Sequence, residues 1–132
     1  MKKTGDTRRV QRVEKEIQAV VGMYLISGFS EPLEVFVTLT RTMMSADLKS
    51  GKVYFTVLLK EDSSVPVDEK TIHETEKLLN EYAHEFQNHI AKELKLRFTP
   101  KIKFFHDVSI DKVRKVDQIL SQISQSSKNS ND

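Results

Sequence analysis

The sequence predicts an α+β fold of two layers, in which a three-stranded sheet carries all of its helices on one face. Apolar residues recur at three- and four-residue steps in some stretches, which is helical spacing, and alternate with polar residues in three others, which is strand spacing. These stretches follow the order helix, strand, strand, long helix, strand, short helix. One helical layer on one sheet buries a single core, so we expect one domain.

Length and composition agree with one soluble domain. A chain of 132 residues is long enough for a real core, and 38% hydrophobic with 30% charged residues is ordinary for a globular protein. The absence of cysteine excludes disulfides, thiolate nucleophiles and thiolate metal sites. No apolar run approaches the roughly 20 residues that span a bilayer, and the charged stretch 4–16 is unlike a secretory signal. We therefore expect a cytoplasmic protein that does not contact a membrane.

The first helix is predicted from residue 7, after a flexible arm over residues 1–6. Its apolar stripe is Val10, Val13, Ile17, Val20, Val21, Tyr24 and Leu25. Arg8, Arg9 and Arg12 lie largely off this stripe. Because basic residues at a helix start oppose the macrodipole, they suit either a binding role or a solvated face. Gly28 is expected to end the helix in the left-handed conformation.

Two strands joined by a hairpin follow the first helix. Residues 33–40 and 52–59 alternate apolar and polar side chains and are rich in β-branched and aromatic residues. The segment 41–51 between them is predicted as the connection, because it contains serine, aspartate and glycine. At its tip, Met43 and Met44 either form an adaptable contact surface or tuck beneath the loop.

A long helix is predicted next, with Asp68 as its N-cap. Its apolar positions are Ile72, Leu78, Leu79, Tyr82, Ala83, Phe86, Ile90 and Leu94. Run straight from Asp68 to Leu96, it would measure about 43 Å, whereas a domain of about 100 residues has a radius of gyration of about 13 Å. We therefore predict a bend near Tyr82 to Glu85, although neither glycine nor proline marks the place.

The charge of this helix reverses along its length. Glutamates dominate the half from Glu74 to Glu85, and lysine and arginine follow. An acidic start and a basic end match the macrodipole, which is a complete explanation by itself. The alternative is that the basic end forms one wall of a surface that meets a polyanion.

The chain closes with a third strand and a short helix. Ile102 and Phe104 alternate with lysines, which is strand spacing. The proline before them, Pro100, is compatible only with the beginning of a strand. We assign residues 7–109 to the folded domain and 110–123, on apolar spacing, to a short C-terminal helix. Residues 124–132 are rich in serine and asparagine and are predicted to be a disordered tail.

Residue patterns that support catalysis or cofactor binding are missing from the sequence. The four histidines lack the three- or four-residue spacing of metal ligands on one helical face. There is no glycine-rich phosphate loop and no nucleophile elbow. No two carboxylates are paired beside an apolar pocket. We therefore expect no enzyme activity, no metal and no cofactor.

Polyanion binding remains, because lysines and arginines are predicted on exposed edges of the first helix, the long helix and the third strand. These candidates for phosphate contact are Arg9, Arg12, Lys92, Lys95, Arg97, Lys101 and Lys103. They indicate contact with a nucleic acid and carry no information on sequence preference.

Several short motifs keep a defined order from Arg9 to Ser109. They are Arg9-x-x-Arg12-Val13, Ser45-x-Asp47-Leu48, Lys52-Val53-Tyr54, Leu96-Arg97-x-x-Pro100-x-Ile102-x-Phe104 and Asp107-x-Ser109. Each motif is short, but in this order and spacing they resemble the ribosome-binding factor A family.

The resemblance implies a KH type II-like domain, related to binders of single-stranded RNA, in the order helix, strand, strand, kinked helix, strand. In this family the Gly-x-x-Gly loop of KH domains is replaced by a kink between two helices, marked by Ala-x-Gly. By position the kink falls at Tyr82, Ala83 and His84. Tyrosine and histidine therefore stand where the family has alanine and glycine.

The resemblance also implies a non-catalytic ribosome assembly factor. Such a protein binds the free small ribosomal subunit and its rRNA as a monomer during late maturation and assists rRNA end processing, including in the cold. A GTPase on the subunit promotes its release. The alternative is a protein interaction module that uses the acidic half, Glu74 to Glu85, and the C-terminal tail.

Overall fold

The computed structural model describes residues 3–108, in which three helices accompany a three-stranded sheet. The elements are α1 (Lys3–Ser27), β1 (Val35–Met44), β2 (Ser50–Leu59), α2 (Glu69–Glu81), α3 (Ala83–Glu93) and β3 (Lys101–His106). β2 lies in the centre of the sheet, antiparallel to β1 and parallel to β3. The α+β class and the three-stranded sheet are confirmed. The helix predicted at 110–123 and the tail at 124–132 lie outside the described residues.

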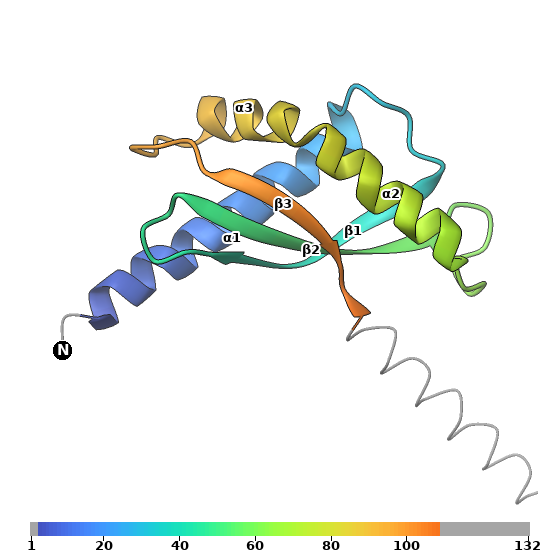
Figure 1. The fold of residues 1–132 in the computed structure, drawn as a ribbon, viewed down its shortest axis with the longest axis horizontal. Helices are drawn as coiled ribbons and strands as arrows, with labels where there is room; N and C mark the ends of the chain where they lie inside the picture. The colour runs from blue at the N-terminus through green and yellow to red at the C-terminus, as the bar shows by residue number, and fades with distance from the viewer. Residues whose placement is uncertain (1–2, 109–132) are drawn as a thin grey trace, which may run out of the picture.

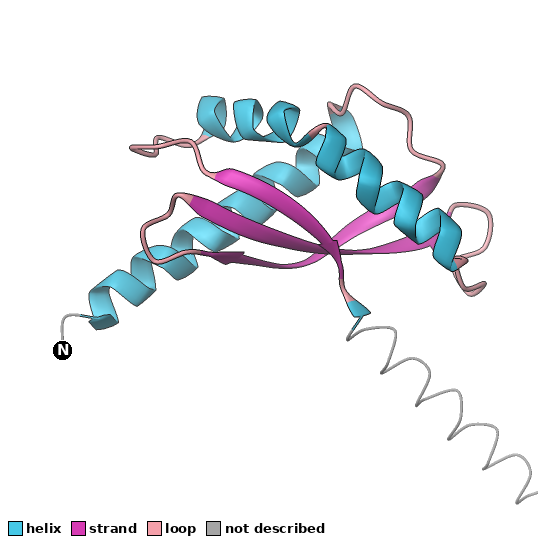
Figure 2. Cartoon of the chain, viewed as in Figure 1, coloured by secondary structure: helices cyan, strands magenta, loops and turns pink. Residues whose placement is uncertain are grey.

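The helices pack on one face of the sheet and share one core. α1 contacts β1 and α3, while α2 and α3 follow β3 end to end (Figure 1). Figure 2 shows the same arrangement, with the loops joining the elements at the ends of the sheet. The fully buried side chains of this core are Ile17, Val21, Val53, Phe55, Leu79, Phe86, Ile90 and Phe104. Ile17 and Val21, two residues of the apolar stripe predicted for the first helix, therefore lie in the core.

α1 differs from the sequence prediction at both of its ends. It begins at Lys3, inside the segment 1–6 predicted as a flexible arm, because an established helix gains one hydrogen bond per added residue without needing an apolar stripe. At the other end, Gly28 does not have a positive φ. A Cβ there would lie 2.7 Å from the Tyr24 ring, so glycine is needed for close approach and not for a left-handed cap.

The hairpin strands are longer than the alternation predicts. β1 continues to Met44 and β2 begins at Ser50, so the turn is confined to residues 45–49 instead of 41–51. Met43 is exposed, whereas Met44 is buried and its Sδ would lie 2.3 Å from a Cβ on Gly51. Both methionines therefore belong to the strand, and one of them tucks into the core.

A β-bulge explains why the strand pattern stops early in the sequence. The register of β1 against β2 shifts between Leu39 and Arg41, so Thr40 is an additional residue. An additional residue exchanges the inward and outward positions beyond it. As a result Thr42 is buried, and its hydroxyl has no hydrogen-bond partner within residues 3–108.

Replacing Thr42 with valine is expected to stabilise the protein. Valine has nearly the shape of threonine and removes a buried, unpartnered hydroxyl, a defect that costs about 1–3 kcal/mol. We expect the free energy of unfolding, measured by urea denaturation, to rise by about 1 kcal/mol. Thr38→Val, at an exposed position of the same strand, is the control. Equal stability of Thr42→Val and wild type would show that water already satisfies this hydroxyl.

The long helix is interrupted at Tyr82, within the segment where its length predicts a bend. α2 ends at Glu81 and α3 begins at Ala83, while Tyr82 between them has φ −103° and ψ 20°. α3 then ends at Glu93, and Leu94 is extended. The helical segment therefore stops short of Leu96, the end of the straight helix considered from the sequence.

The α1–β1 connection holds this break without the help of a glycine. Tyr82 Oη donates a hydrogen bond to the Glu31 carboxylate. Glu85, in the first turn of α3, accepts hydrogen bonds from Tyr24 Oη at 2.7 Å and from the backbone N of Ser30 at 2.9 Å. Burial favours the neutral acid, but the hydrogen bonds from Ser30 and Tyr24 outweigh it and lower the pKa of Glu85.

Polar side chains of α2 and α3 cover the free edge of β3. They satisfy three backbone amides at alternate positions of the strand. The bonds join Ile102 N to Gln87 Oε1 at 3.0 Å, Phe104 N to Asn80 Oδ1 at 2.8 Å and His106 N to Glu76 Oε2 at 2.8 Å. Asn80 Nδ2 also donates to Phe104 O at 3.0 Å. An edge satisfied in this way does not offer a template for pairing with another chain.

Candidate nucleic-acid interface

Basic side chains gather where α1, the hairpin turn and the α3–β3 connection meet. A cavity of about 270 Å³, which we call the end pocket, lies at this junction. Its lining is Arg9, Val10, Ala46, Asp47, Leu48, Lys49, Leu96, Arg97 and Phe98. Three cations from three separate segments, Arg9, Lys49 and Arg97, therefore line one concave surface.

Local hydrogen bonds fix the turn that supplies Lys49. Asp47 Oδ1 accepts from Ser45 Oγ at 2.6 Å and from the backbone N of Lys49 at 3.0 Å. The bond from Ser45, and after it the bond from Lys49, lowers the pKa of Asp47, which keeps this carboxylate ionised. Lys49 O accepts from Lys101 N at 2.9 Å, which ties the turn to β3. The cation is therefore carried on a well-ordered segment.

Phe98 adds an exposed aromatic ring to the end pocket. Its side chain is 49% exposed. Lys49 Nζ lies 5.1 Å and Arg97 Cζ lies 5.3 Å from the ring centroid. Cations within about 6 Å of a ring are attracted by its quadrupole, and exposed aromatic rings are also groups on which bases stack. The pocket thus combines groups that suit phosphates with a group that suits a nucleobase.

The structure brings only two of the seven predicted phosphate-contact residues into this pocket, Arg9 and Arg97. The others are exposed on separate elements: Arg12 on α1, Lys92 in the last turn of α3, Lys95 in the connection that follows, and Lys101 and Lys103 on β3. Arg12 Nε is 3.8 Å from a Glu16 carboxylate oxygen, and this pair is well exposed. Exposed pairs of this kind are weak and leave the guanidinium accessible.

Lys49 and Phe98 are the two functional residues of the pocket that the sequence did not indicate. Lys49 lies in the segment predicted as a connection, where a lysine is unremarkable. Lys49 directly precedes β2 in the structure, but the sequence pattern predicts the start of this strand only at residue 52. The neighbourhood of Arg9 and Arg97 becomes visible once the hairpin turn is placed against α1 and the α3–β3 connection.

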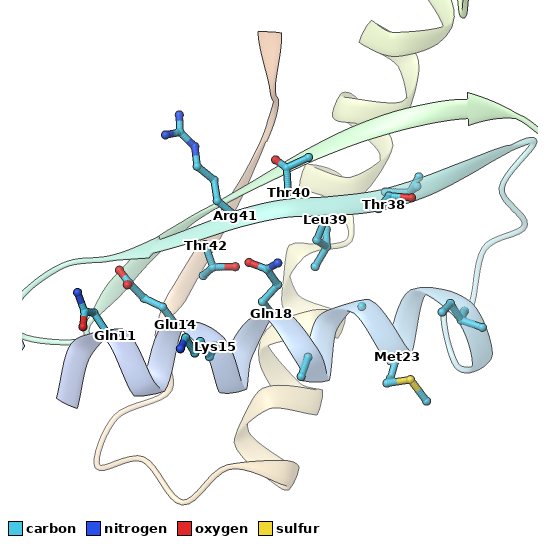
Figure 3. A pocket seen from close by; sticks show the side chains of 14 residues that line it. Gln11, Glu14, Lys15, Gln18, Met23, Thr38, Leu39, Thr40, Arg41 and Thr42 are labelled. Atoms are coloured by element: carbon cyan, nitrogen blue, oxygen red, sulfur yellow. The ribbon is translucent and has the colours of Figure 1, made fainter. Parts of the chain in front are cut away.

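A larger groove lies between α1 and the edge of β1 (Figure 3). It has a volume of about 910 Å³, and its charged lining residues are Glu14, Lys15 and Arg41. Glu14 Oε2 accepts a hydrogen bond from Met44 N at 2.7 Å. Figure 3 shows that the Arg41 side chain points away from α1, while Thr42 points toward it. The groove therefore adds little to the basic surface of the molecule.

The histidines occupy packing and surface positions. His89 stacks on Tyr24 with ring centroids 4.2 Å apart, while His73 and His84 are exposed. Across residues 3–108, no three histidine, aspartate or glutamate side chains are arranged to hold a metal ion.

In the same part of the chain, no helix has both the length and the apolar character to cross a bilayer.

Solved structures share the fold. The crystal structure of ribosome-binding factor A from Thermus thermophilus matches with a TM-score of 0.59 and 13% identity, covering 74% of this chain and 93% of that one. A homology model of the Thermus thermophilus protein, fitted into a cryo-electron microscopy map of a 30S complex with it, matches with a TM-score of 0.56 and 14% identity, over 74% and 93% of the two chains. At these identities the likeness establishes the fold.

The sequence comparisons go further. A family model described as ribosome-binding factor A matches residues 9–120. The ribosome-binding factor A of Bdellovibrio bacteriovorus is 45% identical over 123 residues, which cover 93% of this chain and 86% of the relative. That of Geobacter metallireducens is 30% identical over 116 residues, or 88% and 92% of the two chains. Because these matches span most of the chain, it belongs to the ribosome-binding factor A family.

Proposed function

We propose that this protein is a non-catalytic assembly factor that binds the free small ribosomal subunit through its rRNA. Family membership supports the ribosome as the partner. The observation that carries RNA contact is the end pocket, where Arg9, Lys49 and Arg97 line one surface beside Phe98. Cations placed in this way neutralise neighbouring phosphates, and the release of condensed counterions drives binding.

In this proposal the protein acts late in maturation of the subunit and assists processing of the rRNA ends, including in the cold. It works as a cytoplasmic monomer, and a GTPase on the subunit promotes its release. The order of its elements and the helix break at Tyr82 support a KH type II-like description. Further contacts with rRNA are assigned to the exposed residues Arg12, Lys92, Lys95, Lys101 and Lys103.

Co-sedimentation with purified small subunits tests the proposal. The triple variant Arg9→Ala, Lys49→Ala and Arg97→Ala removes the three cations of the end pocket. The logarithm of the binding constant falls with the logarithm of the salt concentration, and each lost phosphate contact lowers the magnitude of this negative slope by about 0.7–0.9. We therefore expect the magnitude of the slope, measured between about 50 and 200 mM salt, to fall by about 2, with weaker binding throughout.

A matched control separates the pocket from overall charge. Lys15, Lys70 and Lys77 are exposed lysines outside the end pocket, and their alanine variant loses the same charge. This control is expected to keep most of the wild-type slope. If both triple variants lose the same slope magnitude, the end pocket is not a specific site of RNA contact. Wild-type protein that fails to bind at low salt would overturn the proposed function itself.

The alternative, a protein interaction module built on the acidic half Glu74 to Glu85, has less support. Glu76 and Glu85 of this half already accept hydrogen bonds from His106 N and Ser30 N. Two of its carboxylates therefore stabilise the fold itself. Recovery of a protein partner and no rRNA after nuclease treatment would favour this alternative.

A further inference from the structure

The face of the sheet opposite the helices carries two adjacent aromatic rings. Tyr54 of β2 pairs with Phe105 of β3 and with Arg41 of β1, so the three residues form one row across the sheet. The next row pairs Lys52 with Lys103. We call these five residues the sheet platform. Their neighbours in sequence, such as Val53 and Phe104, are buried beneath the helices, which places the platform on the outer face.

The rings of the sheet platform lie side by side, and three cationic side chains lie over them. The centroids of Tyr54 and Phe105 are 5.7 Å apart and the ring planes are inclined by 30°. Arg41 Cζ lies 4.1 Å from the Tyr54 centroid. Lys103 Nζ and Lys52 Nζ lie 5.5 Å and 5.8 Å from the Phe105 centroid.

The cations of the platform have no anionic partner in residues 3–108. No ion pair there involves Arg41, Lys52 or Lys103. Asp107, which follows β3, is buried and accepts a hydrogen bond from Thr40 Oγ1 at 2.6 Å. The platform is therefore a positively charged surface with two neighbouring rings at its centre.

We infer that the sheet platform binds a single-stranded segment of RNA, with two unpaired bases stacked on Tyr54 and Phe105. This inference rests on the proposed function and adds a second contact surface to the end pocket. Aromatic rings on a flat sheet stack unpaired bases of any sequence, and flanking cations neutralise the phosphates between them. A duplex cannot use the rings in this way, because its bases are already stacked on one another.

Binding of short RNAs to the full chain tests the platform. The double variant Tyr54→Val and Phe105→Val removes both rings while keeping strand-forming side chains. For a single-stranded oligoribonucleotide of about 12 nucleotides we expect an affinity loss of about 30-fold. The salt slope should stay close to that of wild type, because stacking releases no counterions. Binding of an RNA duplex of the same length should change little.

The matched control is Phe36→Val. Phe36 is 54% exposed in β1, and Lys60 Nζ lies 5.8 Å from its ring, but it is not part of the platform. It is expected to keep wild-type affinity. If the double variant folds and binds single strands as tightly as wild type, or loses single-strand and duplex binding equally, the inference is wrong.

Crosslinking of wild-type protein gives a second readout that does not depend on the variants. With an oligonucleotide that contains 4-thiouridine, we expect adducts on the peptides that carry Tyr54 and Phe105. Adducts confined to the end pocket would contradict RNA binding at the sheet platform but would remain consistent with the proposed function. Wild-type protein that binds neither small subunits nor single strands would instead overturn the proposed function.

Discussion

Phe86→Ala is expected to lower the free energy of unfolding by about 3–5 kcal/mol, the typical cost of emptying a buried aromatic site. The Phe86 side chain is fully buried. Its ring centroid lies 5.6 Å from that of Tyr24, 4.9 Å from that of Phe29 and 5.0 Å from that of Phe104. One side chain thus joins α3 to α1, to the α1–β1 connection and to β3. A loss of this size is a large part of the stability of a small domain.

Urea denaturation followed by circular dichroism measures this effect. Phe86→Leu should retain more stability, because leucine leaves a smaller cavity, and it provides a folded variant if alanine is not tolerated. Phe36→Ala, at an exposed position, is the control. A loss below about 1 kcal/mol for Phe86→Ala would contradict the tight packing of these rings.

Glu85→Gln is expected to cost about 2 kcal/mol at neutral pH, because hydrogen bonds to a charged acceptor are among the stronger ones. The carboxylate accepts from Tyr24 Oη, from Ser30 N and from Ser30 Oγ. The amide of glutamine offers one acceptor oxygen and turns an NH₂ group toward these donors. The variant should therefore loosen the contact that holds the start of α3 against the α1–β1 connection.

The same carboxylate makes this difference dependent on pH. Because folding lowers the pKa of Glu85, its charged form stabilises the folded state above the ordinary carboxyl pKa of about 4.3. This contribution disappears as the pH falls through the lowered pKa of the folded protein. The stability gap between wild type and Glu85→Gln should therefore be largest near neutrality and shrink in acid. Glu81→Gln, at the exposed end of α2, should show no such gap. A gap that is constant with pH would contradict the role of the charge.

Regular patterns within one element were predictable from the sequence. The apolar stripe of the first helix identified Ile17 and Val21 as core residues, and the length of the second helical segment predicted a break near Tyr82. The break itself depends on long-range contacts such as the one between Tyr82 and Glu31. The contacts that hold it could not be read from the local sequence, which has neither glycine nor proline there.

Features that depend on how elements meet were missed. The additional residue Thr40 reverses the strand alternation, so the pattern that identified the start of β1 failed at its end. Lys49 and Arg97 share a pocket only because three distant segments converge. Tyr54 and Phe105 are neighbours only because β2 and β3 pair in parallel in one particular register. Register between distant strands is a tertiary property, and alternation within a strand does not specify it.

The satisfied edge of β3 has a consequence for the dynamics of the sheet. An outer strand is normally the first to exchange its amide hydrogens with solvent, because half of its backbone groups lack partners. In β3 the amides of Ile102, Phe104 and His106 are held by helix side chains, so this strand behaves like an interior one. Slow exchange should therefore extend from β2 through β3. We expect local opening of the sheet at its opposite edge, at β1, where the bulge already interrupts the ladder of backbone hydrogen bonds to β2.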